Sequence, residues 1–511
     1  MLAITKTAAL RGIEGINVTV EVDSSRGLPA FLVVGLGDAA VKEAGERVRM
    51  ALTNSGFDYP KGRITVNLYP AWIRKKGSHY DLPIAMGLLT IIGVIAQKHL
   101  DRRAFIGELS LEGRLIPIKG ILPMMKGLGE DIDEVIVPKE NMKEAYLALR
   151  DTNIRVIGAE NLSEVVDTVK GKEIRSSDDL KITFEEDHED LDFIDVKGNW
   201  AAKEAIVTAI SGGHGLIMIG SPGTGKSMLA RRIPTILPEM TIEEQIETSM
   251  VYSIAGELTE ERPIITKRPF RKLSARTTIA GILGGGSVPL PGEISLAHNG
   301  VLFMDELLEY GRDKIESLRR PMEEKKITIM RRGVKYTFPA DFIFVAASNP
   351  CRCGYYGDPE KICRCTQREL DSYRSRLSGP LADRIDMCIE LPRIDYEGLT
   401  GGFSQSSEEM KQRIAEAASV QKERFMGTSI RHNADMNENM IKEFCVLERE
   451  AEEMLERAYV KYSLSPRRYF KILKLARTIA DLNNEKDIGT RSLMAALGYV
   501  RQLGMYGKDD D

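Results

Sequence analysis

The pattern of apolar and polar positions predicts different structures at the two ends of the chain. Polar and apolar residues alternate at 18–22 and 64–68, which is typical of strands with one buried face, and residues 39–53 carry the apolar spacing of a helix. Residues 409–505 are rich in Glu, Lys, Ala, Leu and Met at helical spacing. We therefore expect an α+β domain at the N-terminus and an all-helical domain at the C-terminus.

Short continuous apolar runs lie between these regions, at 216–219, 301–304 and 342–347. Apolar runs of this length, bounded by turns or polar residues, are typical of parallel strands that are buried on both faces. The middle of the chain is therefore expected to be an α/β domain built on a parallel sheet.

The first of these strands leads through a glycine-rich turn into 228–231, which opens a helix. The turn consists of Gly220, Ser221, Pro222, Gly223, Thr224, Gly225, Lys226 and Ser227. The glycines let backbone N–H groups point at phosphate oxygens, and the helix dipole adds to the attraction. Lys226 is expected to reach the β- and γ-phosphates of ATP, and the Ser227 hydroxyl to ligate Mg²⁺. The alternative is a strand-to-helix turn that binds nothing.

The other two strands end in polar residues. Asp305 and Glu306 follow the second strand, and Asn349 follows the third. Asp305 can hold the Mg²⁺ shell, and Glu306 can orient and deprotonate the attacking water. Asn349 stands where an amide could touch the γ-phosphate and the water, the sensor position of AAA+ ATPases. An Asp-Glu pair is common by itself, but downstream of a complete phosphate-binding loop it indicates ATP hydrolysis.

Composition and charge restrict how the protein could bind nucleic acid and whether it could cross a membrane. The 511 residues predict about three domains. With 71 Lys and Arg against 75 Asp and Glu, the net charge is −4, so nucleic acid could be bound only by a local basic patch. The longest apolar stretch, 82–96, is too short and too interrupted to span a bilayer, and no leader is evident. We expect a cytoplasmic protein with no membrane contact.

Four of the six cysteines crowd into 15 residues directly after Asn349. They are Cys351, Cys353, Cys363 and Cys365. In a reducing compartment such a cluster favours metal over disulfides, and four thiolates make a closed, structural Zn²⁺ site. The C-x-C spacing is less typical of zinc than C-x-x-C, so four reduced thiols are the alternative. Cys388 and Cys445 are expected to be lone core residues.

Part of the N-terminal region resembles the proteolytic domain of Lon proteases, through 107–120 and 135–141. That family uses a Ser–Lys dyad. Here His79 stands where the serine would align and Leu122 where the lysine would align. Ser78 is one residue away but lacks a neighbouring base in the sequence. We therefore expect a scaffold without protease activity.

Two arginines are candidates for contact with the triphosphate. Residues 379–386 resemble the arginine-finger segment of AAA+ ATPases, in which Arg384 would reach a neighbouring subunit's site. The alternative is an intrachain ion pair with Asp383 or Asp386. Arg467 stands like the second sensor arginine of the helical lid, in a helix with Ser465 as N-cap and Pro466 as its first residue. Arg468 is the fallback, and lid packing is the alternative role.

Several segments together identify the chain as similar to the ComM (YifB-type) family of magnesium-chelatase-like AAA+ ATPases. These segments are 193–198, 291–303, 349–354 and 476–482. The resemblance implies ATP and Mg²⁺ as cofactors and a homo-hexamer that moves along single-stranded or branched DNA. It implies branch migration in homologous recombination and natural transformation, and no tetrapyrrole. A chelatase-type motor that remodels a protein partner is the alternative.

The same resemblance places Val196 in the nucleotide site and also exposes two departures. Relatives usually carry Pro-His-His after Arg-Pro-Phe-Arg, whereas this chain has Lys272-Leu-Ser. Asn199-Trp200 stands where Gln-Glu is usual, near the expected adenine pocket. Neither change is expected to touch Lys226, Asp305 or Glu306, so ATP hydrolysis is expected to survive.

The same resemblance implies two inserted loops that would face the channel of a ring. Residues 284–292 would interrupt a helix, and residues 326–335 would form a hairpin turning at Gly333. The hairpin carries a basic cluster able to grip phosphates: Lys326, Arg331, Arg332 and Lys335. A solvated surface hairpin is the alternative.

The expected fold class is α/β, with a P-loop AAA+ core. The domain limits are a Lon-like α+β domain lacking the dyad at 1–175, an acidic linker at 176–192, the magnesium-chelatase-type core at 193–396, a second linker at 397–408 and the helical lid at 409–511.

Overall fold

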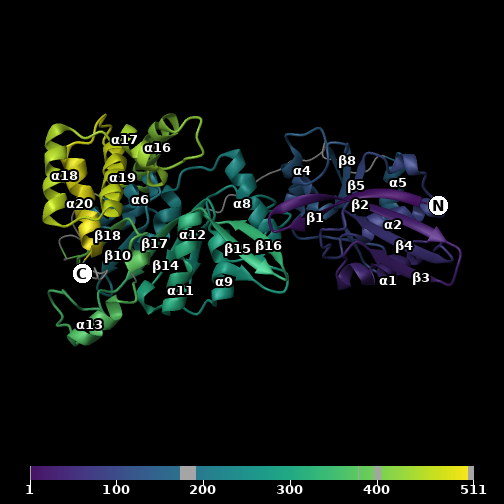
Figure 1. Cartoon of the computed structure of the whole chain (residues 1–511), viewed down its shortest axis with the longest axis horizontal. Helices are drawn as coiled ribbons and strands as arrows, with labels where there is room; N and C mark the ends of the chain where they lie inside the picture. Colours follow the sequence, from purple (N-terminus) through teal and green to yellow (C-terminus); the bar gives the residue numbers. More distant parts are fainter. Residues whose placement is uncertain (1, 173–190, 378, 395, 397–403, 505–511) are drawn as a thin grey trace. The chain divides into compact units, whose positions relative to one another are not determined.

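A computed structural model describes residues 2–172, 191–377, 379–394, 396 and 404–504 (Figure 1). The chain divides into two compact units. Unit 1 contains Met1–Asp187, Ile242–Ile265 and Met330–Thr337, and unit 2 contains the rest. Most of the two predicted linkers, and the last seven residues, lie outside the described residues.

Unit 1 is built on a seven-stranded mixed sheet with the order β3-β4-β2-β1-β5-β8-β9. Its strands are β1 (Leu2–Arg11), β2 (Glu14–Ser25), β3 (Ala30–Val34), β4 (Arg63–Tyr69), β5 (Arg103–Phe105), β8 (Glu134–Pro138) and β9 (Arg155–Ala159). The alternation noted in the sequence sets the register: Val20 pairs with Leu68 and Val22 with Val66, and all four side chains are buried. A one-residue slip would expose this whole row.

Helices cover this sheet. They are α1 (Ala39–Asn54), α2 (Asp81–Ile91), α3 (Ile121–Lys126), α4 (Met142–Leu149) and α5 (Leu162–Val169), and a small ribbon joins β6 (Glu108–Leu109) to β7 (Leu115–Ile116). Asp38 caps α1 by accepting from Val41 N at 3.0 Å, which satisfies one of the free N–H groups of the first turn. The predicted α+β character of the N-terminal region is confirmed.

A helix from the middle of the chain also belongs to unit 1. Helix α8 (Ile242–Ala255) packs against α3, where Gly120 N donates to Ser253 O at 3.0 Å. Glu144 of α4 accepts hydrogen bonds from the Ser253 hydroxyl and from Leu122 N. Residues 242–265 and 330–337 therefore group with the N-terminal region, although their place in the sequence assigned them to the core.

Unit 2 contains a five-stranded parallel sheet with the order β11-β14-β17-β10-β18. The strands are β10 (Leu216–Gly220), β11 (Phe270–Leu273), β14 (Gly300–Met304), β17 (Phe342–Ser348) and β18 (Met387–Leu391). The three predicted apolar strands are all present and adjacent. Every residue of β10 and β14 is buried, because apolar clusters cover both faces of the sheet. The parallel α/β core is confirmed.

Apart from α6, which has 13 residues, the helices of this core are short. They are α6 (Trp200–Gly212), α7 (Lys226–Arg232), α9 (Ile279–Leu283), α10 (Glu293–Leu296), α11 (Arg312–Ser317), α12 (Arg319–Glu324), α13 (Gln367–Arg374) and α14 (Gly379–Ala382). A small ribbon, β12 (Gly284–Gly285) with β13 (Leu290–Pro291), separates α9 from α10. Gly284 has φ +91°, and a Cβ there would lie 2.4 Å from Leu290 O, so the ribbon requires glycine. The predicted hairpin forms from β15 (Lys326–Arg331) and β16 (Val334–Pro339).

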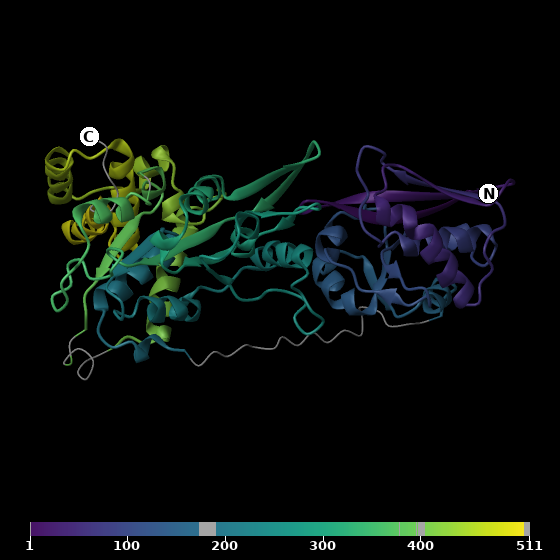
Figure 2. The same cartoon turned by 90° about the horizontal axis from the view of Figure 1, so that it is seen from below.

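The C-terminal helices lie together in both views (Figure 1, Figure 2). They are α16 (Ser407–Arg424), α17 (Glu438–Phe444), α18 (Arg449–Lys461), α19 (Pro466–Leu482) and α20 (Thr490–Gly504). Ser465 caps α19 and Pro466 is its first residue, as predicted. Among the described residues, the helices are all too short or too polar to cross a membrane.

Candidate active site

The loop between β10 and α7 is shaped by glycines. Gly223 and Gly225 have φ of +87° and +89°, a backbone region that residues other than glycine rarely adopt. A Cβ on Gly220 would lie 2.8 Å from Leu391 O of the neighbouring strand. Asn199 supports the loop from outside, since its amide Nδ2 donates to Thr224 O at 3.1 Å. The strand, the loop and the helix thus follow one another as the phosphate-binding mechanism requires.

Lys226 lies inside this loop. Its Nζ donates to Gly220 O at 2.6 Å and to Ser221 O at 3.0 Å, and Asn349 Oδ1 lies 3.4 Å away. Burial lowers the pKa of Lys226 from 10.5 to about 8, against the opposing charges of Asp305 and Glu306. The lysine therefore links the end of β10 to the end of β17.

The acidic residues stand at the same edge of the sheet. The Ser227 hydroxyl donates to the Asp305 carboxylate at 3.2 and 3.3 Å. Glu306 directly follows, with φ +54°, and begins the turn into a short 3₁₀ helix, Leu307–Glu309. A hydroxyl beside a carboxylate is an oxygen donor set that suits Mg²⁺. The structure therefore brings Lys226, Ser227, Asp305 and Asn349 together at the carboxyl ends of three adjacent strands.

Val196 lies on the approach to α6. It is 2% exposed and belongs to the apolar cluster around α6 and β10. Asn199 follows it with φ +51°, and Trp200 is half exposed. Asn199, one of the departures from the family pattern, thus still contacts the P-loop, through the hydrogen bond that its side-chain amide donates to Thr224 O.

The two candidate arginines form a second cluster. Arg384, with its side chain 9% exposed, is ion-paired with Glu323 of α12. The sequence offered Asp383 or Asp386 as intrachain partners, and the ion pair observed is with a third acid, Glu323. Arg467 NH1 lies 3.3 Å from Asp383 Oδ2 and is half exposed. In the single chain both arginines are therefore engaged by acids of their own chain.

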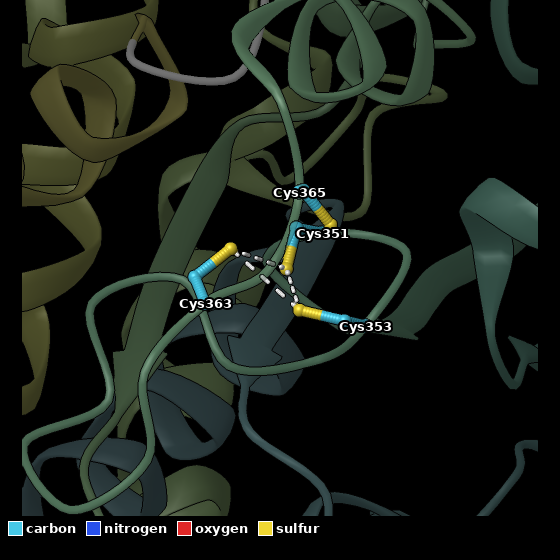
Figure 3. Close-up of side chains that lie close together, drawn as sticks. All are labelled: Cys351, Cys353, Cys363 and Cys365. Carbon is cyan, nitrogen blue, oxygen red and sulfur yellow. Dashed lines mark hydrogen bonds between the residues drawn. The ribbon is translucent and has the colours of Figure 1, made fainter.

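The four clustered cysteines converge. The Sγ atoms of Cys351, Cys353 and Cys363 are 3.4 to 3.8 Å apart, and all four sulfurs lie within 4.8 Å of one another (Figure 3). Tetrahedral zinc with Zn–S bonds of about 2.3 Å needs sulfurs about 3.8 Å apart. Four thiols at these separations fit a structural zinc ion. Cys388 and Cys445 are buried apart from it, as predicted.

The segment 351–365, hereafter the cysteine loop, touches the P-loop. Gly354, with φ +85°, packs on Pro222, and a Cβ there would lie 2.7 Å from the proline ring. Asp358 accepts a hydrogen bond from the Ser221 hydroxyl, and Arg393 Nε donates to Asp358 at 2.8 Å. Burial opposes ionisation, but these bonds, the backbone N–H groups of 360 and 361 and the Arg393 charge lower the Asp358 pKa to about 2.

Comparisons with known proteins agree with this geometry. Residues 192–399 match the family described as magnesium chelatase, subunit ChlI, residues 20–141 match subunit ChlI of Mg-chelatase, and residues 404–500 match the ChlI C-terminal family. Competence protein ComM of Haemophilus influenzae is 40% identical over 515 residues, which cover 99% of each chain. The chain belongs to the ComM family.

Other relatives place this ComM-family protein within the magnesium-chelatase-like AAA+ ATPases. The uncharacterized protein YifB of Escherichia coli is 37% identical over 98% of this chain and 97% of its own. A magnesium-chelatase 67 kDa subunit of Chlorobaculum tepidum is 30% identical over 160 residues, which are 31% of this chain and 23% of that subunit. The protein is therefore an AAA+ ATPase by family.

The positions of the Lon-type dyad have other roles in this ComM-family protein. His79 is buried, its Nε2 lies 3.0 Å from Ala8 O, and burial lowers its pKa to about 4. Leu122 is buried in α3. The Ser78 hydroxyl donates to the Glu108 carboxylate, a neighbour that sequence reasoning did not supply. His79, Leu122 and Ser78 thus serve packing and hydrogen bonding in this protein.

Three functional candidates were missed in the sequence: Lys272, Asp358 and Arg393. Lys272 stands within the departure from Pro-His-His, which was expected not to touch Asp305. That expectation is wrong, because the Lys272 ammonium lies 3.0 Å from Asp305 Oδ2. Asp358 and Arg393 lie 35 positions apart, and no local pattern connects them to the P-loop. Only the fold brings these side chains to the site.

Proposed function

We propose that this protein is a ring-forming motor that hydrolyses ATP and acts on DNA, as a branch-migration helicase in homologous recombination and natural transformation. The observation that carries the ATPase part is the meeting of Lys226, Ser227, Asp305 and Asn349 at one edge of the sheet. In this role Lys226 binds the β- and γ-phosphates, and Ser227 and Asp305 hold Mg²⁺, which neutralises phosphate charge when bound. Glu306 activates the water, and Asn349 orients it.

The ring is proposed from the second cluster. Arg384 and Arg467 lie with Glu323 and Asp383 rather than among the P-loop contacts described above. In a homo-hexamer, Arg384 would exchange Glu323 for the γ-phosphate in a neighbouring subunit, and Arg467 would approach it from the lid. The exchange is favourable because a triphosphate carries more charge than one carboxylate. An isolated subunit should then hydrolyse ATP poorly.

DNA is proposed as the partner because of the hairpin and the full-length similarity to a competence protein. Lys326, Arg331, Arg332 and Lys335 of the hairpin have exposed or half-exposed cations, which can bind phosphates in a salt-dependent way. Tyr336, in the same hairpin, accepts a hydrogen bond from Lys76 Nζ at 2.6 Å within unit 1. The basic turn would therefore grip DNA from an anchored position.

A structural zinc ion is proposed for Cys351, Cys353, Cys363 and Cys365. All four thiolates would be ligands, so no position would remain open for catalytic water.

The domain limits predicted from the sequence are also proposed for this protein, with the core at 193–396 and the lid at 409–511. Within the core limits, residues 242–265 and 330–337 group with unit 1.

The second candidate is a chelatase-type motor that remodels a protein partner, favoured by the matches to ChlI families. ATPase turnover with and without forked DNA, after assembly has been checked by mass photometry, separates the two. Stimulation by forked or single-stranded DNA is expected. If assembled rings hydrolyse ATP at the same rate with and without DNA, the DNA motor is contradicted and the motor that remodels a protein is favoured.

A further inference from the structure

Lys272 places a positive charge beside Asp305, the carboxylate that is proposed to hold Mg²⁺. It lies on β11, paired in register with Phe303 of β14, and its ammonium is 5.8 Å from the Phe303 ring. Asp305 follows Phe303 by two positions, so the side chains of Phe303 and Asp305 point to the same side of the sheet. Lys272 Nζ reaches Asp305 Oδ2 at 3.0 Å. The carboxylate proposed for the metal is thus already paired with a cation.

The backbone around Lys272 is fixed by its neighbours. Arg271 forms two hydrogen bonds with Glu293, at 2.6 and 2.9 Å. The buried Tyr310 hydroxyl donates to Leu273 O at 2.7 Å. The Lys272 side chain itself is 45% exposed, so its ammonium can move into solvent while the strand stays in place.

We propose that Lys272 competes with Mg²⁺ for Asp305: the ammonium neutralises the carboxylate before the metal–nucleotide complex arrives and is displaced when it binds. The inference rests on the proposed ATP site. The reason is electrostatic, since one carboxylate beside Ser227 attracts either cation, and each must displace the other. Lys272 therefore raises the Mg²⁺ concentration that the site requires.

The size of the effect follows from the partial exposure of the pair. Half-exposed ion pairs are weak, so removing Lys272 should lower the half-saturating Mg²⁺ concentration by about two- to fivefold. Salt screens this competition, and the difference should shrink as ionic strength rises.

The test is a Mg²⁺ titration of the binding of a fluorescent, non-hydrolysable ATP analogue to the full chain, followed by anisotropy. Lys272→Ala and Lys272→Gln should both bind at lower Mg²⁺ than wild type, and Lys272→Arg should stay near wild type because it keeps the charge. Lys314→Ala is the matched control, since Lys314 Nζ contacts a backbone carbonyl, Ala275 O, instead of a carboxylate.

Two outcomes overturn the inference, and they are distinguishable. An unchanged or higher Mg²⁺ requirement in both neutral variants, with wild type binding normally, refutes the competition alone. If wild type binds no analogue at any Mg²⁺ concentration, both the competition and the proposed ATP site are refuted, whereas analogue binding that is independent of Mg²⁺ refutes the competition alone. Thermal melting of each variant confirms that the comparison is made on folded protein.

Discussion

Asp358 of the cysteine loop accepts a hydrogen bond from Ser221 of the P-loop. The cysteine cluster and the nucleotide site are therefore not separate features of this protein. The cysteine loop lies against the phosphate-binding turn, through Gly354 on Pro222 and Asp358 on Ser221. Arg393 holds this loop by donating hydrogen bonds to Asp358 and Glu360.

Loss of this contact should weaken nucleotide binding. Asp358→Ala removes the acceptor for Ser221 and is expected to lower ATP affinity about 3- to 10-fold, which is less than the full energy of a charge-assisted hydrogen bond because Asp358 only positions the loop. Fluorescent nucleotide titration measures it. Chelation of the proposed zinc by a strong chelator should weaken binding in the same direction. Glu360→Gln is the control, because it leaves Asp358 in place; equal affinity of Asp358→Ala and wild type would contradict the coupling.

The P-loop lysine and the adjacent glutamate should separate binding from hydrolysis. Lys226→Ala is expected to abolish nucleotide binding, because no other group in the turn supplies the cation. Glu306→Gln is expected to bind ATP normally and to lower turnover by about 10²–10⁴-fold, the contribution of a general base. Equilibrium binding and phosphate release measure the two effects. Activity near wild type in either variant would refute the site assignment.

Arg384 should act across a subunit boundary. Arg384→Ala is expected to bind ATP and to lose about 10³-fold or more in turnover. Mixing it with Lys226→Ala should restore part of the activity, because some interfaces then combine an intact P-loop with an intact Arg384. Absence of recovery in rings shown to be mixed would contradict the finger. Glu323→Gln is the control, since it breaks the ion pair within the chain and leaves the arginine in place.

The hairpin cations should carry the response to DNA. Replacing Arg331 and Arg332 by alanine should reduce the DNA-stimulated part of the ATPase and lower the salt dependence of DNA binding by up to two ionic contacts. Filter binding at several salt concentrations provides the measurement. Replacing Arg449 and Arg457 by alanine, two exposed lid arginines, is the charge-matched control. Equal salt slopes for the double variant and wild type would place DNA elsewhere.

Glu144 should make the stability of the protein depend on pH. Burial raises its pKa from 4.5 to about 7, against hydrogen bonds from Ser253 and Leu122 N. The folded state binds this proton more tightly than the unfolded state, so stability is lost as pH rises from about 4.5 to 7 and stays lower above that range. The cost is about 3 kcal/mol at most.

Glu144→Gln keeps the shape without the charge. It should therefore be more stable than wild type at pH 8 and similar at pH 4.5, as measured by thermal or urea unfolding. Glu140→Gln on the surface nearby is the matched control. If the wild-type and Glu144→Gln profiles run parallel across this range, the assigned pKa is wrong.

The sequence by itself determined the local machinery of this protein. The turn from Gly220 to Ser227 and the apolar strands ending at Asp305 and Asn349 are specified by residues close together in the chain, since backbone conformation and burial pattern leave short-range signals. The capping of α19 by Ser465 is of the same kind. These expectations, with the α/β class and the family, are confirmed.

The tertiary structure alone decided which residues, distant in the sequence, lie next to the P-loop, Asp305 and the other candidate site residues. Lys272 reaches Asp305 because two parallel strands pair in one register, and Asp358 reaches Ser221 because the cysteine loop folds back over the P-loop. Likewise α8 joins the N-terminal unit through Ser253 and Glu144, and Arg384 pairs with Glu323, which lies 61 positions away in the sequence. Such contacts depend on strand order and packing, which are set by the chain as a whole and leave no periodic signal around any one residue.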